Sequence, residues 1–212
     1  MFLSIKKNAQ ILAAFAIICT AITGLVNELT KNTIEVQHQQ QLLTTLHAII
    51  NPKRLDNDMY HDCVVVSDPA LGTNDPQKVY LATLKGQPVA AAITTIAPDG
   101  YSGNIELLVA INANGSISGV RALKHQETPG LGDKIEIRKS SWIRSFVGKV
   151  VHGKQDSQFA VAKDGGMFDQ FTGATITPRA VVKAVKNTVL YFNKHQADIF
   201  NSTHFCRNEK HT

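Results

Sequence analysis

The sequence predicts an α+β fold, in which a single N-terminal transmembrane helix is followed by one domain with an antiparallel sheet and packed helices. A charge-free apolar segment near the start of the chain indicates the transmembrane helix. Five segments rich in β-branched residues, followed by one long amphipathic helix, indicate the domain. A length of 212 residues with 43% hydrophobic residues suits one compact domain and a short appendage.

The membrane anchor is predicted at residues 8–27, which carry no charged side chain and include an unbroken apolar run at 11–18. As a helix this segment would be about 30 Å long, enough to cross the hydrocarbon core of a bilayer. Lys6 and Lys7 precede it and a mixed set of charges follows it, so we expect a cytoplasmic N-terminus. A cleaved signal peptide is the alternative, although residues 21–23 make a poor cleavage site.

A helical stalk is predicted after the anchor, in a Gln-rich segment that ends at Pro52. Its apolar side chains recur at helical spacing, at Val36, Leu43, Leu46 and Ile50. The chain is therefore divided into a cytoplasmic start and transmembrane anchor at 1–30, a helical stalk at 31–55 and an extracytoplasmic domain at 56–212.

The domain is predicted to begin with antiparallel hairpins. The β-rich segments are 63–66, 79–84, 89–96, 105–111 and 117–123. Gly and Asn interrupt them at 85–87 and 112–115, where tight turns are expected.

Two helices are predicted in the rest of the domain. A short one at 140–147 surrounds Trp142, and a long one runs from Pro178 to about Ile199. The side chains expected on the buried side of the long helix are Val181, Val182, Val185, Val189 and Phe192.

Composition and motifs argue against several classes of function. The net charge of +5 is modest, and the basic residues are scattered instead of forming the stripe that nucleic-acid binding needs. The sequence has no nucleophile elbow, phosphate-binding Walker loop or dinucleotide fingerprint. None of the eight His residues lies in a zinc-binding pattern. We therefore predict no catalytic residue and no metal site.

The loop at 169–178, which opens the long helix, carries the most specific chemistry. We expect Thr177 to cap the helix and Pro178 to occupy its first turn. A helix start has unpaired N–H groups and positive dipole charge, so a phosphate held by Thr175 would lie where anions are stabilised. Gly173 and Ala174 keep side-chain bulk away from the Thr175 hydroxyl, which leaves it accessible to another enzyme.

The series Asp169, Thr172, Gly173, Ala174 and Thr175 resembles the flavinylation motif of FMN-binding domains in sodium-pumping NADH:quinone reductase and Rnf complexes. The whole chain is most similar to the family of the G subunits of Rnf complexes, called Rsx in some bacteria. The resemblance implies that a separate magnesium-dependent flavin transferase, with FAD as donor, attaches FMN through its phosphate to Thr175. It also implies that Asp169 helps the transferase recognise its target, and that Thr172 and Gly173 shape the loop.

Two further loops, at 100–103 and 125–133, resemble loops that line the flavin in these domains, although such Gly-rich clusters otherwise form simple turns. We expect apolar ring contacts from Tyr101 and Leu131, and hydrogen bonds from Thr128 and backbone N–H groups. His125 and Glu127 would share one face of a strand and orient their loop. The cofactor-binding residues implied in these loops are Tyr101, Ser102, Glu127, Thr128, Gly130 and Leu131.

The resemblance implies an electron-transfer subunit of a membrane complex that couples ferredoxin and NADH redox chemistry to cation transport, or keeps a redox regulator reduced. Its implied partners are the other subunits and the flavin transferase, and its implied location is the bacterial inner membrane with a periplasmic domain. One alternative is the related FMN-binding C subunit of the quinone reductase. Another is an extracytoplasmic FMN-binding sensor or scaffold without a redox role.

The chain has three cysteines, of which Cys19 lies in the predicted anchor. Cys63 and Cys206 would both lie in an oxidising compartment, where two remaining cysteines commonly form a bridge. Two free thiols are the alternative, because a distance cannot be read from the sequence.

Overall fold

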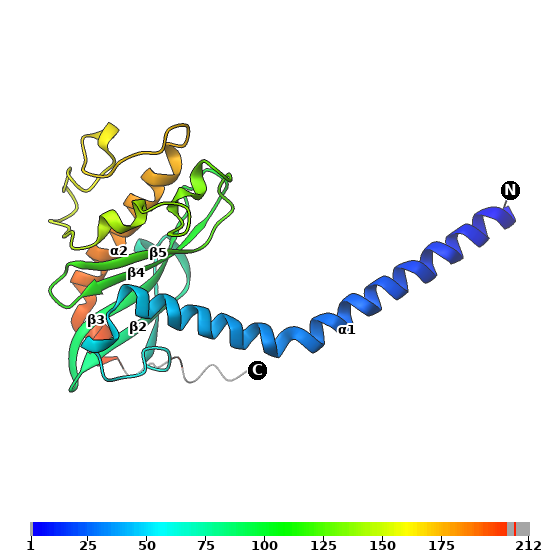
Figure 1. Ribbon diagram of the computed structural model, residues 1–212, viewed down its shortest axis with the longest axis horizontal. Helices are drawn as coiled ribbons and strands as arrows, with labels where there is room; N and C mark the ends of the chain where they lie inside the picture. The colour runs from blue at the N-terminus through cyan, green and yellow to red at the C-terminus, as the bar shows by residue number, and fades with distance from the viewer. Residues whose placement is uncertain (1, 203–205, 207–212) are drawn as a thin grey trace. The chain divides into compact units, whose positions relative to one another are not determined.

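The computed structural model describes residues 2–202 and residue 206 of the chain. The first element is one uninterrupted helix, α1 (Phe2–Ile49), drawn in blue in Figure 1. It contains a stretch at Ile5–Lys31 that is long and apolar enough to cross a membrane, with a mean hydropathy of 2.2. The chain divides into two compact units at Thr44 and Thr45, so most of α1 is separate from the domain that follows.

The threonine hydroxyls within the apolar stretch of α1 form hydrogen bonds to the backbone of the same helix. The hydroxyl of Thr23 donates to the carbonyl of Cys19 at 2.7 Å, and the hydroxyl of Thr20 donates to the carbonyl of Ala16. Inside a bilayer an unpaired hydroxyl would be costly, and a bond to the preceding turn removes that cost. The threonines are therefore compatible with a membrane-spanning helix.

The domain is built on a five-stranded antiparallel sheet in which each strand pairs with the next along the chain. The strands are β1 (Cys63–Asp68), β2 (Thr73–Leu84), β3 (Gln87–Ala97), β4 (Ile105–Asn112) and β5 (Ile117–Lys124). All five predicted strands and the antiparallel α+β class are confirmed. β2 begins earlier than predicted, because the turn at η2 (Pro69–Leu71) returns the chain directly alongside β1.

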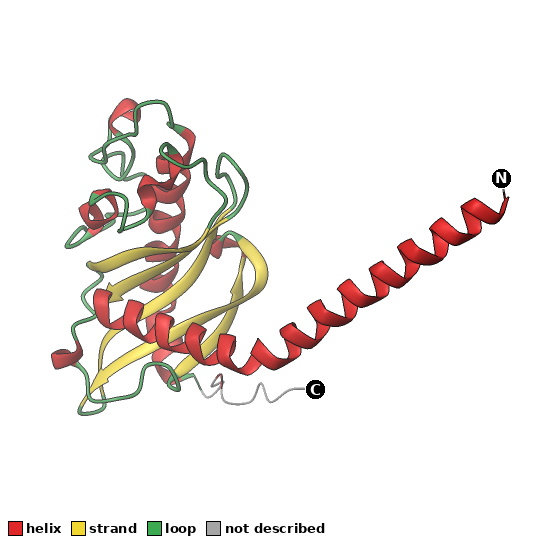
Figure 2. Ribbon diagram, turned by 45° about the vertical axis from the view of Figure 1, so that its right-hand side comes forward, coloured by secondary structure: helices red, strands yellow, loops and turns green. Residues whose placement is uncertain are grey.

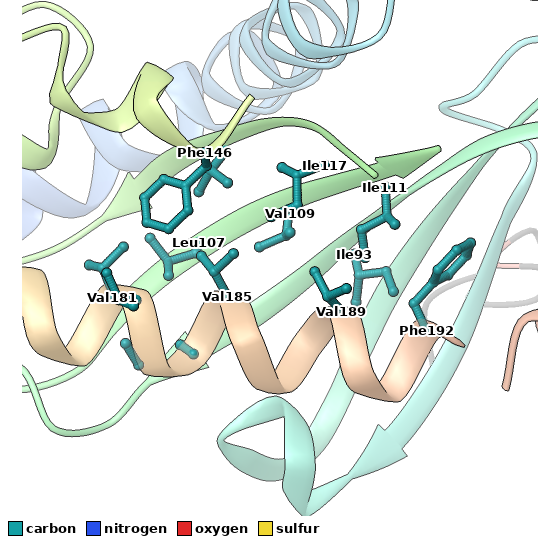
Figure 3. Close-up of a cluster of buried hydrophobic side chains, with 14 of the residues drawn as sticks. Ile93, Leu107, Val109, Ile111, Ile117, Phe146, Val181, Val185, Val189 and Phe192 are labelled. Atoms are coloured by element: carbon teal, nitrogen blue, oxygen red, sulfur yellow. The ribbon is translucent and has the colours of Figure 1, made fainter. Parts of the chain in front are cut away.

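One face of the sheet is covered by helix α2 (Ile176–Asn201). All five side chains predicted on its buried side are buried. Figure 3 shows Val181, Val185, Val189 and Phe192 of this helix turned toward side chains of β3, β4 and β5. Because burying one such side chain stabilises a fold by about 1.5 to 3 kcal/mol, this layer fixes the helix on the sheet.

The opposite face of the sheet receives the last turn of α1, which belongs to the same compact unit as the sheet (Figure 2). Leu46, Ile49 and Ile50 are buried there, and the carbonyl of Ile49 accepts a 2.5 Å bond from the hydroxyl of Ser118. A Cβ on Gly119 would lie 2.8 Å from the Ile49 side chain, so only glycine allows this approach.

The loops between β5 and α2 are held by short 3₁₀ helices and aromatic contacts. The predicted helix at 140–147 is the 3₁₀ helix η4 (Trp142–Phe146), which is shorter and tighter than an α-helix. Its two aromatic rings contact Phe159, Phe168 and Phe171 at centroid distances of 4.4 to 6.1 Å. This cluster supports the chain that leads into α2.

The structure joins Cys63 and Cys206 in a disulfide, with Cα atoms 5.4 Å apart. Of the two alternatives considered for these cysteines, the structure therefore has the bridge. It ties the first residue of β1 to the chain beyond α2, across a sequence separation of 143 residues. Cys19 is a free thiol on α1.

Candidate functional site

A cleft of about 250 Å³ lies where the first turn of α2 meets the loops that follow β3 and β5. It is lined by Tyr101, Glu127, Thr128, Leu131, Gly132, Gly173, Ala174, Thr175, Ile176 and Thr177. Three segments distant in sequence therefore form one site, and all three were singled out from the sequence.

Thr175 lies in the N-cap position of α2, but its hydroxyl does not cap the helix. Two features explain this. Its backbone has helical dihedral angles (φ −91°, ψ −21°) in place of the extended ones usual at a cap. Pro178, the third residue of the helix, has no N–H to offer. The side chain of Thr175 is exposed in the cleft, so its hydroxyl is available for chemistry.

A tight turn presents Thr175 to the cleft. The N–H of Ala174 donates to the carbonyl of Phe171 at 3.1 Å, which closes a four-residue turn. Gly173 takes the third position with a φ of +81°, a conformation that favours glycine. A Cβ there would contact only Leu131, at 3.4 Å, so backbone conformation and not space accounts for the glycine.

Thr177 is not the helix cap, and that prediction is wrong. α2 starts at Ile176, and Thr177 lies inside its first turn with 1% of its surface exposed. Its hydroxyl donates to a carboxylate oxygen of Glu127. The cap prediction failed because the sequence pattern gave no sign that a partner for Thr177 comes from another loop.

Glu127 is buried beside the cleft with 4% of its surface exposed. Besides the hydroxyl of Thr177, its carboxylate accepts a 3.0 Å bond from the N–H of Ser102. The chain leaves β5 at Lys124, so Glu127 and His125 lie on a loop and not on a strand as expected. The expected orienting contact is present: the N–H of Glu127 donates to Nδ1 of His125 at 3.1 Å.

The walls of the cleft combine apolar surface with backbone polarity. Tyr101 is 67% exposed, Leu131 41% and Ile176 45%, an unusual degree of exposure for three large side chains around one cleft. The carbonyl of Thr128 accepts hydrogen bonds from the N–H groups of Leu131 and Gly132, at 3.2 and 3.1 Å. These bonds close the loop at 128–132 into a tight turn. Such a site suits a flat aromatic ligand with polar edges.

Four of the predicted site residues do not line the cleft. They are Ser102, Gly130, Asp169 and Thr172. The side chains of Asp169 and Thr172 are exposed, and the carbonyl of Asp169 accepts a 2.9 Å bond from the indole N–H of Trp142. The residues named from the sequence as cofactor-binding do not include Gly132, Ile176 and Thr177, which line the cleft although they lie in the two loops singled out at 125–133 and 169–178.

The helix start is braced by an ion pair just outside the cleft. Arg179 donates from Nε and from a terminal nitrogen to the two carboxylate oxygens of Asp164, at 2.7 and 2.9 Å. The Arg179 guanidinium holds the pKa of the Asp164 carboxyl below its ordinary value. Within the described residues, no group of His, Cys, Asp and Glu is arranged to hold a metal ion.

Comparisons with known proteins identify the family of the chain. Residues 100–190 match the family of the FMN-binding domain, and residues 1–49 match the RnfG N-terminal region. The chain is 56% identical to the G subunit of the ion-translocating oxidoreductase complex of Shewanella baltica, over 92% of each chain. It is 50% identical to the same subunit of Vibrio cholerae, over 99% of this chain and 100% of the relative. The chain therefore belongs to the RnfG family, the G subunits of ion-translocating oxidoreductase complexes, and carries the family's FMN-binding domain.

Proposed function

We propose that this protein is an electron-transfer subunit that carries FMN bonded through its phosphate to Thr175. The observation that carries the proposal is the Thr175 hydroxyl, which is exposed in the cleft at a helix start and makes no capping bond. A hydroxyl without a structural role, beside the unpaired N–H groups of Ile176 and Thr177, suits an attached phosphate.

Attachment requires a transferase and FAD. The Thr175 oxygen attacks the phosphorus on the FMN side of FAD, the pyrophosphate bond breaks, AMP leaves and the hydroxyl proton is released. The turn at 171–174 supports this step because it carries small residues next to the acceptor. The exposed side chain of Asp169, two residues before this turn, would contact the transferase.

The lining residues fit the rest of the cofactor. Tyr101 and Leu131 would contact the flat ring, and the hydroxyl of Thr128 and nearby N–H groups would meet its polar edge. FMN supplies the ability to accept and donate one or two electrons, and attachment at the phosphate leaves the ring free to do so. The protein itself converts no substrate in this proposal.

The relatives are named as subunits of an ion-translocating oxidoreductase complex, so we place this chain in such a complex. Other subunits would supply and remove its electrons and couple them to cation movement or to reduction of a redox regulator. We place the domain in the periplasm, because Lys6 and Lys7 precede the apolar stretch of α1. Covalent attachment suits that location, where lost FMN would diffuse away.

The test is coexpression of the full chain with its transferase. The wild-type band should fluoresce under ultraviolet light after denaturation, and its intact mass should show one FMN less one water. Thr175→Ala should lose both signals while its free energy of unfolding changes by less than about 0.5 kcal/mol, because no capping bond is lost. Thr175→Ser should keep the acceptor, and Thr172→Ala should reduce loading less than Thr175→Ala. A loaded Thr175→Ala chain would refute the attachment site.

A non-redox sensor would also bind FMN, so a second measurement separates the two roles. In the purified complex, the flavin of this subunit should be reduced by the electron donor within the turnover time, as followed by absorbance. Turnover without reduction of this flavin would favour the sensor or scaffold role.

A further inference from the structure

The carboxylate of Glu127 connects two walls of the cleft. Its Oε1 accepts the 3.0 Å bond from the N–H of Ser102, and its Oε2 accepts the bond from the hydroxyl of Thr177. Among the described residues, no cation forms an ion pair with this carboxylate. Burying a polar group is costly unless its atoms form hydrogen bonds, and each of the two oxygens of Glu127 has one.

Two glycines, Gly100 and Gly132, lie against this carboxylate. A Cβ on Gly132 would lie 2.8 Å from Oε2 of Glu127 and 2.9 Å from the hydroxyl of Thr177. A Cβ on Gly100 would lie 3.0 Å from Oε1 and 2.2 Å from the carbonyl oxygen of Gly103. Since neither Gly100 nor Gly132 has a positive φ, space and not backbone conformation accounts for both glycines. Gly132 is thus required by the carboxylate and the Thr177 hydroxyl, and Gly100 chiefly by the nearby carbonyl of Gly103.

The orientation of the loop that carries Glu127 is also fixed by hydrogen bonds outside the cleft. Nδ1 of His125 accepts the N–H of Glu127, so in this arrangement the ring carries its proton on Nε2. Nε2 then donates to the carboxylate of Glu136 at 3.1 Å. The backbone that carries the Glu127 side chain is therefore held by side chains that do not enter the cleft.

We propose that Glu127 is a positioning residue for flavin attachment, acting through Thr177 and Ser102. Thr177 lies two residues beyond Thr175 in the same helical turn, and Tyr101 directly precedes Ser102. Each carboxylate bond therefore acts on a neighbour of a residue that would contact FMN. The bridge fixes the acceptor hydroxyl relative to the wall of the cleft. This inference rests on the proposed role of Thr175.

The experiment measures FMN transfer to the full-length chain in detergent, with purified transferase, FAD and magnesium. Thr177→Val removes the hydroxyl with little change of shape, and Thr177→Ser keeps it. We expect Thr177→Val to lower the rate at saturating acceptor by about tenfold or more, because the acceptor is misplaced. The acceptor concentration for half-maximal rate should stay unchanged, because the surface that meets the transferase is intact. Thr177→Ser should restore the rate.

The matched control is Thr188→Val. Thr188 is fully buried in the same helix, and its hydroxyl donates to the carbonyl of Ala184 at 2.8 Å. The substitution removes the same kind of group at a position outside the cleft. We expect transfer at the wild-type rate. A loss equal to that of Thr177→Val would show a general effect of helix stability and would overturn the proposal.

The variant Glu127→Gln distinguishes the effect of the hydrogen-bonded bridge from the effect of a negative charge on residue 127. A carboxamide can accept the N–H of Ser102 with its oxygen and donate its NH₂ to the hydroxyl of Thr177, so the bridge survives without the charge. We therefore expect Glu127→Gln to lose less of the transfer rate than Thr177→Val, because the bridge is kept. A folded Glu127→Gln chain that loses as much as Thr177→Val or more would show that the charge itself is required, and would overturn the positioning role.

Folding is verified by the near-ultraviolet circular dichroism of Trp142. If Thr177→Val fails this check, Gly132→Ala replaces it, because its Cβ would push the carboxylate and the Thr177 hydroxyl apart without removing either group. A wild-type rate for the variant used would overturn this inference alone. Absence of FMN from the wild-type chain would overturn the proposed function and this inference together.

Discussion

Tyr80 shows how a single buried side chain can make stability depend on pH. It lies on β2 with 4% of its surface exposed, and burial raises its pKa to about 12, with a further contribution from Tyr60. In the unfolded chain the phenol has its ordinary pKa of 10.0. The folded protein therefore binds this proton more tightly than the unfolded chain, and its stability falls as the pH rises through that interval.

We expect the ionisation of Tyr80 to lower the free energy of unfolding of the protein by about 2 kcal/mol as the pH rises from 10 to 12. Tyr80→Phe should remove that part of the decline, while Tyr101→Phe, at an exposed position, should not. The measurement is denaturant unfolding of the full chain, followed by far-ultraviolet circular dichroism at a series of pH values. Parallel pH profiles for wild type and Tyr80→Phe would contradict the expectation.

Two threonines at the start of α2 show where residue-level prediction stops. The sequence identified Thr177 as the cap, because a Thr before a Pro commonly begins a helix. In the structure Thr175 occupies the cap position, and Thr177 turns inward to Glu127, fifty residues earlier in the chain. Local patterns place a helix start within a few residues, but a side-chain partner from a distant loop has no local signal.

At the scale of elements, the bridge between Cys63 and Cys206 connects β1 to the end of the domain. Under denaturing conditions the unreduced full chain should titrate one thiol, that of Cys19, and the reduced chain all three. Cys206→Ser should lower the free energy of unfolding by about 5 kcal/mol at most, an upper value from chain entropy for so long a loop. Three thiols in the unreduced chain would rule out the bridge.

The elements were predicted well where apolar and β-branched residues are concentrated, or where apolar residues recur at helical spacing. β3 and β4 pair in continuous register from Ala90 with Asn112 to Ala97 with Ile105, and each was found from its apolar and β-branched residues. The stretch at 132–168 was predicted poorly. It is held by Trp142 and four phenylalanines and not by a repeating pattern, and such an arrangement depends on packing between distant residues.

At the scale of the whole molecule, the apolar stretch of α1 predicts a protein that remains in the membrane. The full chain should stay in the membrane fraction after an alkaline wash, because the stretch at Ile5–Lys31 is long and apolar enough to cross a bilayer and has no charged side chain at 8–27. A periplasm-dependent reporter fused after Thr212 should be active, since Lys6 and Lys7 favour a cytoplasmic N-terminus. Recovery of a soluble chain that begins near Asn27 would show cleavage and contradict the anchor.

The site itself was only partly predictable from physics. The helix start and the small residues beside Thr175 indicate a phosphate position, but the loops at 100–103 and 125–133 were associated with it only through a family resemblance. Turn-forming residues look alike in every loop. The fold alone brings these loops to one cleft, because β3, β5 and α2 end or begin at the same end of the sheet.

Trp142 is an intrinsic fluorescent probe of the cleft. It is the only tryptophan in the chain, and its indole nitrogen donates to the carbonyl of Asp169 while its ring lies 5.0 Å from that of Phe171. Both partners belong to the loop that leads to Thr175. A flavin absorbs at wavelengths where tryptophan emits, so a flavin held in the cleft would accept the excitation energy of Trp142. The dimming of this one emission would report the fraction of chains that carry the cofactor, without any added label.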